Sequence, residues 1–172
     1  MDLKFRPLKE NEIDVRVQSV TEKGCILLLY KDARVDMNIL DEVVGPMNWK
    51  RHHELINGQL FCTISIYDSD KKEWVSKQDL GTESFTEKEK GQSSDSFKRA
   101  GFCWGIGREL YTSPFIWVKA EDCNIKDNRG KKACSDKFVV EKIAYDESHN
   151  ITGLSIVNTN NKKRVFLLKP AK

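Results

Sequence analysis

SSDSFKRAGFCWGIGRELY, residues 93–111, places two adjacent cations in a mostly apolar setting. Apolar side chains recur there at helical spacing, which favours a helix packed on a neighbouring element: Phe97, Ala100 and Trp104. Lys98 and Arg99 lie about 100° apart around such a helix, so one broad face can carry both. The helix is therefore expected to pack by one face and to present cations on another.

The helix is expected to run over roughly residues 85–104. Ser84 and Glu87 match a capping box at its start. Gly105 and Gly107 follow its last apolar residue, and glycine often ends helices.

Apolar runs bounded by turn residues predict strands on both sides of this helix. The predicted strands cover residues 13–20, 25–30, 49–56, 59–67, 74–80, 137–146, 151–158 and 164–169. A short helix over residues 36–45 is expected to be capped by Asp36 and ended by Gly45, and an Asn-Gly pair at residues 57–58 predicts a hairpin. Residues 119–136 form an irregular polar stretch. This order predicts an α+β fold, in which one long helix packs on an antiparallel β-meander (a β-β-β-α core) and C-terminal β-strands follow.

Length and charge narrow the class of protein. The chain has 172 residues and a net charge of +3, and this length is typical of a single domain. Residues 119–172 hold 12 Lys and Arg against 7 Asp and Glu, which favours either a polyanion partner or a solvated surface. The sequence has no run of 18 apolar residues, and residues 1–17 have no apolar signal segment, so neither membrane insertion nor secretion is expected.

The cysteines give no recognisable metal motif. A zinc site needs four ligands at close spacings, and the histidines do not complete one. The cysteines are therefore expected to be buried free thiols in a reducing compartment, without a metal or other cofactor. There are five: Cys25, Cys62, Cys103, Cys123 and Cys134.

The sequence gives only weak evidence for a catalytic site. Asp68, Asp70 and Lys72 could form a metal-dependent nuclease cluster, but Asp, Ser and Lys are also common where a hairpin turns. His52 and His53 are neighbours on a predicted strand and point to opposite faces, so they cannot easily share a metal ion. The sequence has no P-loop and no nucleophile elbow. No catalytic residue is assigned, and an enzyme is not expected.

Nucleic-acid binding accounts better for the cations on the long helix. Lys90 lies two turns before Lys98 and near the same side of the helix. Cations that line a groove suit single-strand binding without sequence preference, because they contact phosphates and not bases. The alternative is a solvated Lys-Arg pair without a role.

Four segments occur in a recognisable order: LDEVVGPMNWKRH, NGQLFCTISIYD, LGTES and EKGQSSDSFKRAGFCWGIGRELY. Together they resemble the Rad-fifty-two family of single-strand DNA annealing proteins, over roughly residues 25–111. The resemblance extends to short phage and prophage members through YKDARVDMNILDE and GRELYTSPFIW.

The resemblance implies a domain over residues 1–172, with an annealing core at about 12–111 and a β extension at about 112–172. Such proteins assemble into rings or helical filaments, hold single-stranded DNA in a basic groove, and anneal strands without ATP or metal. It implies homologous recombination and repair in the cytoplasm of a bacterial host, with a single-strand-binding protein as a further candidate partner.

The resemblance also implies DNA-binding positions. The Lys-Arg pair of the family's helix maps onto Lys98 and Arg99, a basic residue ahead of the short helix onto Arg34, and an earlier helix cation onto Lys90. Further candidates are Lys31, Arg51 and Arg108, and a second DNA site has loose candidates in Lys71, Lys72 and Lys77.

Some eukaryotic relatives carry a further arginine one turn beyond the Lys-Arg pair, where this chain has Phe102 and Cys103. An aromatic side chain there could stack on a base or fill the core, and the core is favoured. Two other functions stay open. One is an RNA- or DNA-binding module that does not anneal, and the other is a metal-dependent nuclease that uses Asp68 and Asp70.

Overall fold

A computed structural model describes residues 3–82 and 88–170, of which residues 88–90 are described without their side chains. The contacts within the chain define two compact units. Unit 1 comprises residues 1–6 and 32–108, and unit 2 comprises residues 7–31 and 109–172. Most of unit 1 is therefore inserted between the two parts of unit 2. Whether the whole chain acts as one annealing domain stays a prediction.

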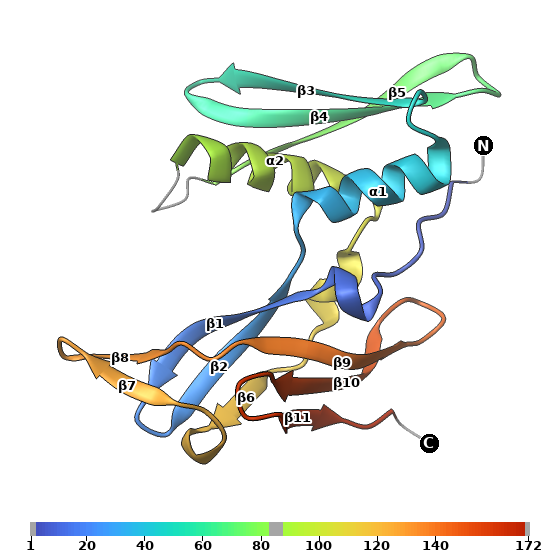
Figure 1. The fold of residues 1–172 in the computed structure, drawn as a ribbon. Helices are drawn as coiled ribbons and strands as arrows, with labels where there is room; N and C mark the ends of the chain where they lie inside the picture. The colour runs from blue at the N-terminus through green and yellow to red at the C-terminus, as the bar shows by residue number, and fades with distance from the viewer. Residues whose placement is uncertain (1–2, 83–87, 171–172) are drawn as a thin grey trace. The chain divides into compact units, whose positions relative to one another are not determined.

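Unit 1 is a three-stranded antiparallel sheet with two helices on one face (Figure 1). Strands β3 (Trp49–Ile56), β4 (Gln59–Asp68) and β5 (Glu73–Leu80) pair in chain order. The helices are α1 (Ala33–Val44) and α2 (Lys88–Trp104). The predicted α+β class with antiparallel strands is confirmed, but this sheet carries two helices and not the single long helix of the predicted core.

The core of unit 1 lies between the inner face of the sheet and the two helices. Its most buried members alternate along β4 and recur at helical spacing on α1 and α2: Ile39, Leu40, Cys62, Ile64, Ile66, Phe97 and Ala100. Trp104 anchors the end of α2, because its Nε1 donates to the Ile64 carbonyl at 3.1 Å. The backbone just after β5 also passes close to α2, since a Cβ on Gly81 would lie 2.3 Å from the Gln92 carbonyl oxygen.

The start of α1 differs from the prediction. Asp32, in an extended conformation, caps the helix by accepting the N–H of Arg34 at 2.8 Å, so the predicted cap at Asp36 is wrong. Asp36 is buried within the first turn. Both aspartates precede the same apolar face, so the hydrophobic pattern could not distinguish them. Gly45 ends α1 with φ +84° as expected, and the Ser84–Glu87 capping box lies outside the described residues.

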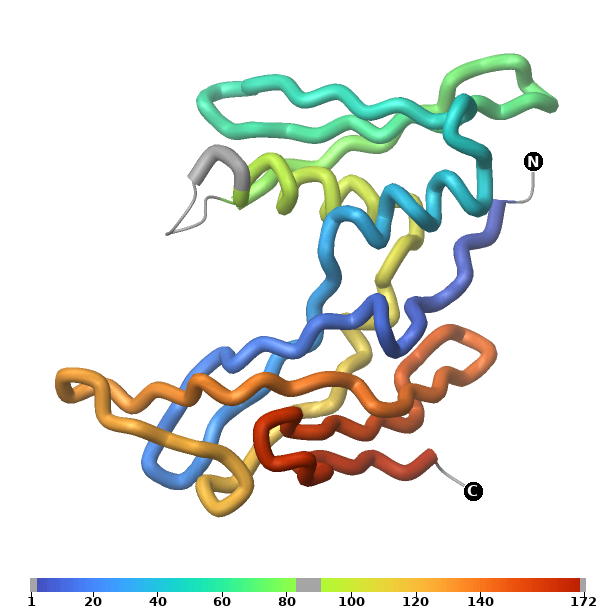
Figure 2. Tube along the Cα trace, in the orientation of Figure 1, coloured from blue at the N-terminus to red at the C-terminus, as the bar shows by residue number. Residues whose placement is uncertain are grey.

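Unit 2 is built on a six-stranded antiparallel sheet in the order β11-β10-β9-β1-β2-β6, whose edge strands β6 and β11 contact each other. A separate hairpin, β7–β8, extends from it (Figure 2). The strands are β1 (Asp14–Thr21), β2 (Gly24–Tyr30), β6 (Ile116–Lys119), β7 (Ile125–Asn128), β8 (Lys131–Cys134), β9 (Phe138–Tyr145), β10 (Ile151–Asn158) and β11 (Lys163–Leu168). Short 3₁₀ helices cover Glu10–Glu12, Arg108–Thr112 and Ala120–Asp122.

A buried polar network joins the two chain segments of unit 2. Glu109, only 4% exposed, accepts the N–H of Leu8 at 2.6 Å. The Tyr145 hydroxyl donates to the Leu8 carbonyl at 2.8 Å, and burial raises the pKa of this phenol. Glu109 of the GRELY motif thus has a structural role here. Among the described residues, no helix is both long and apolar enough to cross a bilayer.

Candidate nucleic-acid interface

Two predicted DNA-binding cations, Arg34 and Lys98, act on the carboxylate of Asp32 at the start of α1. Arg34 Nε lies 2.8 Å from Asp32 Oδ1, and Lys98 on α2 lies close enough to interact electrostatically with the same carboxylate. The hydrogen bonds from Arg34, with a smaller contribution from Lys98, hold the pKa of the Asp32 carboxyl below its ordinary value. We call Asp32, Arg34 and Lys98 the Asp32 cluster. Its formation follows from the packing of α1 against α2 within unit 1.

Arg99 takes a different direction from Lys98. Its Nε lies 3.6 Å from Asp79 Oδ2 on β5, and its side chain is 40% exposed. This distance is longer than a hydrogen bond, and the Nε atom is buried without an acceptor. The two adjacent cations therefore lie in different environments, Lys98 near the start of α1 and Arg99 near β5.

Two other candidates meet at the end of α2. Lys77 Nζ and Arg108 Nη2 donate to the Cys103 carbonyl at 2.8 and 2.9 Å, and Arg108 Nε donates to the Phe102 carbonyl at 2.6 Å. The last carbonyls of a helix lack intrahelical partners and carry partial negative charge, which cations satisfy. These contacts give Lys77 and Arg108 a structural role that needs no DNA.

Arg51 lies at the inner face of the sheet, and its guanidinium carbon is 5.1 Å from the centroid of the Phe97 ring. Lys71 and Lys72 are exposed in the turn between β4 and β5, away from the Asp32 cluster in sequence and pairing. Among the contacts that the structure describes, none joins Arg51, Lys71 or Lys72 to the Asp32 cluster.

Lys31 belongs to unit 2 and is only 2% exposed, so little of this residue is accessible to a phosphate. Lys90 lies in the first described turn of α2, and its side chain is outside the described structure.

The outer face of the sheet, opposite the helices, carries an aromatic group that sequence reasoning missed. Tyr67 and Trp74 face each other across β4 and β5, with ring centroids 5.4 Å apart. Lys50 Nζ lies 4.2 Å from the centroid of the Trp74 ring. Trp74 itself is 42% exposed. Strand alternation puts successive residues of 49–56 and of 74–80 on opposite faces, but only the register of the sheet shows that Lys50 and Trp74 share a face.

The acidic turn has a structural explanation. Asp68 Oδ1 accepts the N–H groups of Asp70 and Lys71 at 2.9 and 3.3 Å, as aspartate commonly does in turns. Among the residues that the structure describes, no third His, Cys, Asp or Glu side chain joins Asp68 and Asp70. His53 contacts Ser93 on α2, whereas His52 lies on the opposite face and is exposed. The geometry therefore favours a turn over a nuclease cluster.

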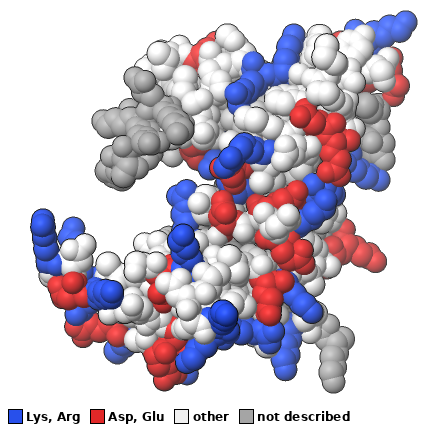
Figure 3. Space-filling model, viewed as in Figure 1, with Lys and Arg blue, Asp and Glu red and all other residues white. Residues whose placement is uncertain are grey.

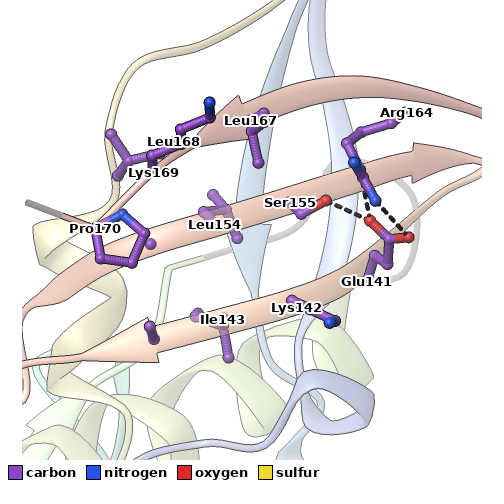
Figure 4. Close-up of a pocket in the computed structure, with 12 residues that line it drawn as sticks. Glu141, Lys142, Ile143, Leu154, Ser155, Arg164, Leu167, Leu168, Lys169 and Pro170 are labelled. Carbon is purple, nitrogen blue, oxygen red and sulfur yellow. Dashed lines mark hydrogen bonds and ion pairs between the residues drawn. The ribbon is translucent and has the colours of Figure 1, made fainter.

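Unit 2 carries a pocket of about 370 Å³ over β9, β10 and β11, shown in Figure 4. Arg164 Nε lies 2.8 Å from Glu141 Oε2, and Ser155 donates to the same carboxylate. The hydrogen bonds from Arg164 and then Ser155 lower the pKa of Glu141 to about 2. Glu141 is therefore ionised at neutral pH and tethers β11 to β9, and it is not a proton donor under those conditions.

Charge is unevenly divided between the units. By sequence, unit 1 has 13 Lys and Arg against 14 Asp and Glu, whereas unit 2 has 16 against 12. On the face drawn in Figure 3, cations and anions are interspersed. Any attraction of the Asp32 cluster for phosphate is therefore local, since unit 1 has almost no net charge.

Comparisons of the chain with protein-family models, with curated proteins and with solved structures gave no match.

Proposed function

We propose that this protein binds single-stranded DNA and anneals complementary strands without ATP, as a homo-oligomer that acts in phage recombination and repair in a bacterial cytoplasm. The Asp32 cluster carries this proposal. Arg34 and Lys98 come from separate segments, and the family resemblance assigns both to one groove. In unit 1, Arg34 and Lys98 both interact with the carboxylate of Asp32.

The architecture of unit 1 supports the same proposal. Strands β3, β4 and β5 followed by α2 have the order of the β-β-β-α core that the resemblance implies. We assign this part of the chain as the annealing core, with α1 beside α2 completing the cation site.

Phosphate can compete with Asp32 for its cations. The Arg34 side chain is 83% exposed, and exposed ion pairs contribute only roughly 0.2–1 kcal/mol. The start of α1 adds partial positive charge from its backbone N–H groups. A DNA backbone that brings several phosphates at once can therefore replace the carboxylate as the partner of these cations.

The outer face of the sheet suits a second contact with DNA. Aromatic rings bind bases of any sequence by stacking, at about 1–3 kcal/mol per base. Trp74 beside Lys50 offers such a ring together with a cation for the neighbouring phosphate. Annealing needs two strands in proximity, and two separate contact surfaces meet that need.

The direct test is annealing of two complementary fluorescent oligonucleotides without ATP or magnesium, with the protein's mass measured by light scattering. The proposal expects faster annealing by a large oligomer. A monomer that binds duplex RNA and does not anneal would instead support the binding module, and magnesium-dependent shortening of the oligonucleotides would support the nuclease.

The site is tested by the double variant Arg34→Ala with Lys98→Ala. Single-strand affinity should fall, and the log–log slope of affinity against salt should become shallower by about 0.7 for each phosphate that the variant no longer neutralises. The charge-matched control is Lys23→Ala with Lys126→Ala, which removes two exposed lysines from unit 2. Unchanged affinity and slope in a folded double variant would remove the Asp32 cluster from the site.

A further inference from the structure

Three cysteines that are far apart in sequence converge in unit 2. Cys25 lies on β2, Cys123 follows the 3₁₀ helix at residues 120–122, and Cys134 ends β8. Their three sulfur atoms all lie within 4.8 Å of one another, and the sulfurs of Cys25 and Cys123 are 3.9 Å apart. We call these residues the cysteine cluster. The other two cysteines, Cys62 and Cys103, belong to unit 1.

The spacing of the sulfurs fits a shared metal ion. Zinc binds thiolate sulfur at about 2.3 Å in tetrahedral geometry, which places two ligand sulfurs roughly 3.8 Å apart. The 3.9 Å between Cys25 and Cys123 matches this separation. A disulfide would need the two sulfurs at about 2.0 Å and would leave the third thiol unused.

The surrounding structure holds the cluster in place. Asn158, fully buried, donates from Nδ2 to the Asp122 carbonyl at 3.1 Å and to Asp136 Oδ2 at 2.8 Å. These two contacts fix both ends of the segment that carries Cys123 and Cys134. Asp136 Oδ2 also accepts the N–H of Asn124 at 2.8 Å, directly after Cys123. Asp136 is therefore used to hold the segment and does not complete the ligand set.

The cysteine cluster reaches solvent through Cys123, which is half-buried. Cys123 lines an open depression of about 380 Å³, together with Glu22, Ala120, Asn124, Ile125 and Lys132. Within residues 3–82 and 88–170, no fourth Cys, His, Asp or Glu ligand joins the three sulfurs. A water molecule from this depression can therefore supply the fourth ligand. The Lys132 ammonium at its wall is already paired, since it lies 3.6 Å from Glu22 Oε1 and 3.3 Å from Asp127 Oδ2.

We propose that Cys25, Cys123 and Cys134 bind one Zn²⁺ ion, with water as the fourth ligand. Each thiol releases its proton to solvent and ligates as a thiolate, and no electron is transferred. The ion fastens the β7–β8 hairpin to β2. For these three of the five cysteines, the proposal departs from the expectation from sequence of free thiols without a metal.

The test uses the full chain, reduced and stripped of metal, titrated with Zn²⁺ against a chromophoric chelator. One ion per chain should bind. Cys123→Ser and Cys134→Ser should each weaken binding at least about 100-fold, because even outer-shell changes at metal sites cost 10–100-fold. The matched control is Cys103→Ser, which changes a half-buried cysteine outside the cluster and should leave zinc affinity unchanged.

A second measurement does not depend on the folding of any variant. Co²⁺ added to the unaltered protein should give sulfur-to-cobalt charge-transfer absorption, and Zn²⁺ should abolish it. Absence of stoichiometric zinc binding, a cobalt spectrum without sulfur bands, or equal zinc affinity in both cluster variants and the control would each overturn the proposal.

Discussion

Asp32 caps α1 and is also the anion beside Arg34 and Lys98, the two side chains proposed to bind DNA phosphates. The cap needs only an oxygen acceptor for the N–H of Arg34, whereas the ion pair with Arg34 needs the negative charge. The two roles can therefore be separated by replacing the carboxylate with an amide of the same shape.

Asp32→Asn is expected to tighten single-strand DNA binding a few-fold, because DNA no longer has to break the ion pair between Asp32 and Arg34. Exposed ion pairs of this kind contribute about 0.2–1 kcal/mol. Thermal stability should change little, since asparagine caps helices about as well as aspartate. Fluorescence anisotropy at fixed salt measures the affinity. Glu147→Gln, at an exposed position in the β9–β10 turn, controls for net charge. Equal or weaker binding by Asp32→Asn alone would contradict the role of the Asp32 cluster.

The limits of prediction at this scale are visible in Lys98 and Arg99. Helical periodicity puts the two side chains about 100° apart and led to the prediction that one broad face carries both. It could not show that Lys98 would meet α1 while Arg99 would meet Asp79, because those partners depend on how the helix packs. Two cations that looked like one feature in the sequence belong to separate environments.

At the scale of elements, the end of α2 explains cations that resemblance alone assigned to DNA. Lys77 and Arg108 converge on the Cys103 carbonyl from β5 and from the segment after α2. Such caps stabilise a helix whether or not a ligand is bound.

Arg108→Ala should therefore lower the free energy of unfolding by about 0.3–1 kcal/mol, the range for a cation at a helix C-terminus. Single-strand affinity should stay within error of the unaltered protein. Chemical denaturation and anisotropy on the same preparation give both quantities. Lys98→Ala should show the opposite profile, with weaker DNA binding and unchanged stability. Weaker DNA binding without a drop in stability in Arg108→Ala would return this residue to the DNA site.

Most elements could be predicted because their apolar residues alternate or recur. The strands over residues 49–56 and 151–158 were predicted at their observed bounds. The β7–β8 hairpin was missed because its strand residues are largely polar and none is fully buried, so no periodic apolar face marks it. In the structure its two central turn residues, Arg129 and Gly130, both have positive φ, as a type I′ hairpin turn requires.

At the scale of the whole molecule, pairing between distant segments could not be foreseen. β1 pairs with β9, and β2 with β6, across the inserted unit 1. Local periodicity identifies a strand but not its partner. The cysteine cluster was hidden for the same reason, because Cys25 has no metal-binding spacing to Cys123 in the sequence.

The proposed oligomer must bury apolar surface that the single chain exposes. Phe115 is 71% exposed in unit 2, unusually open for a large aromatic residue. Phe115→Ser is expected to lower the mass measured by light scattering. Leu167→Ser, at a half-exposed apolar position on β11, serves as the comparison. An unchanged mass in Phe115→Ser would exclude this residue from the subunit contact.

The insertion of unit 1 also determines the order in which the parts of unit 2 emerge from the ribosome. Cys25 precedes Cys123 by 98 residues, so at about 5–20 residues per second its thiol emerges roughly 5–20 s before its first partner. During that interval the complete segment of unit 1 leaves the ribosome and can fold, while β1 and β2 still await β6 and β9. The three proposed zinc ligands are therefore complete only after unit 1 has emerged, but before β9, β10 and β11 have been synthesised.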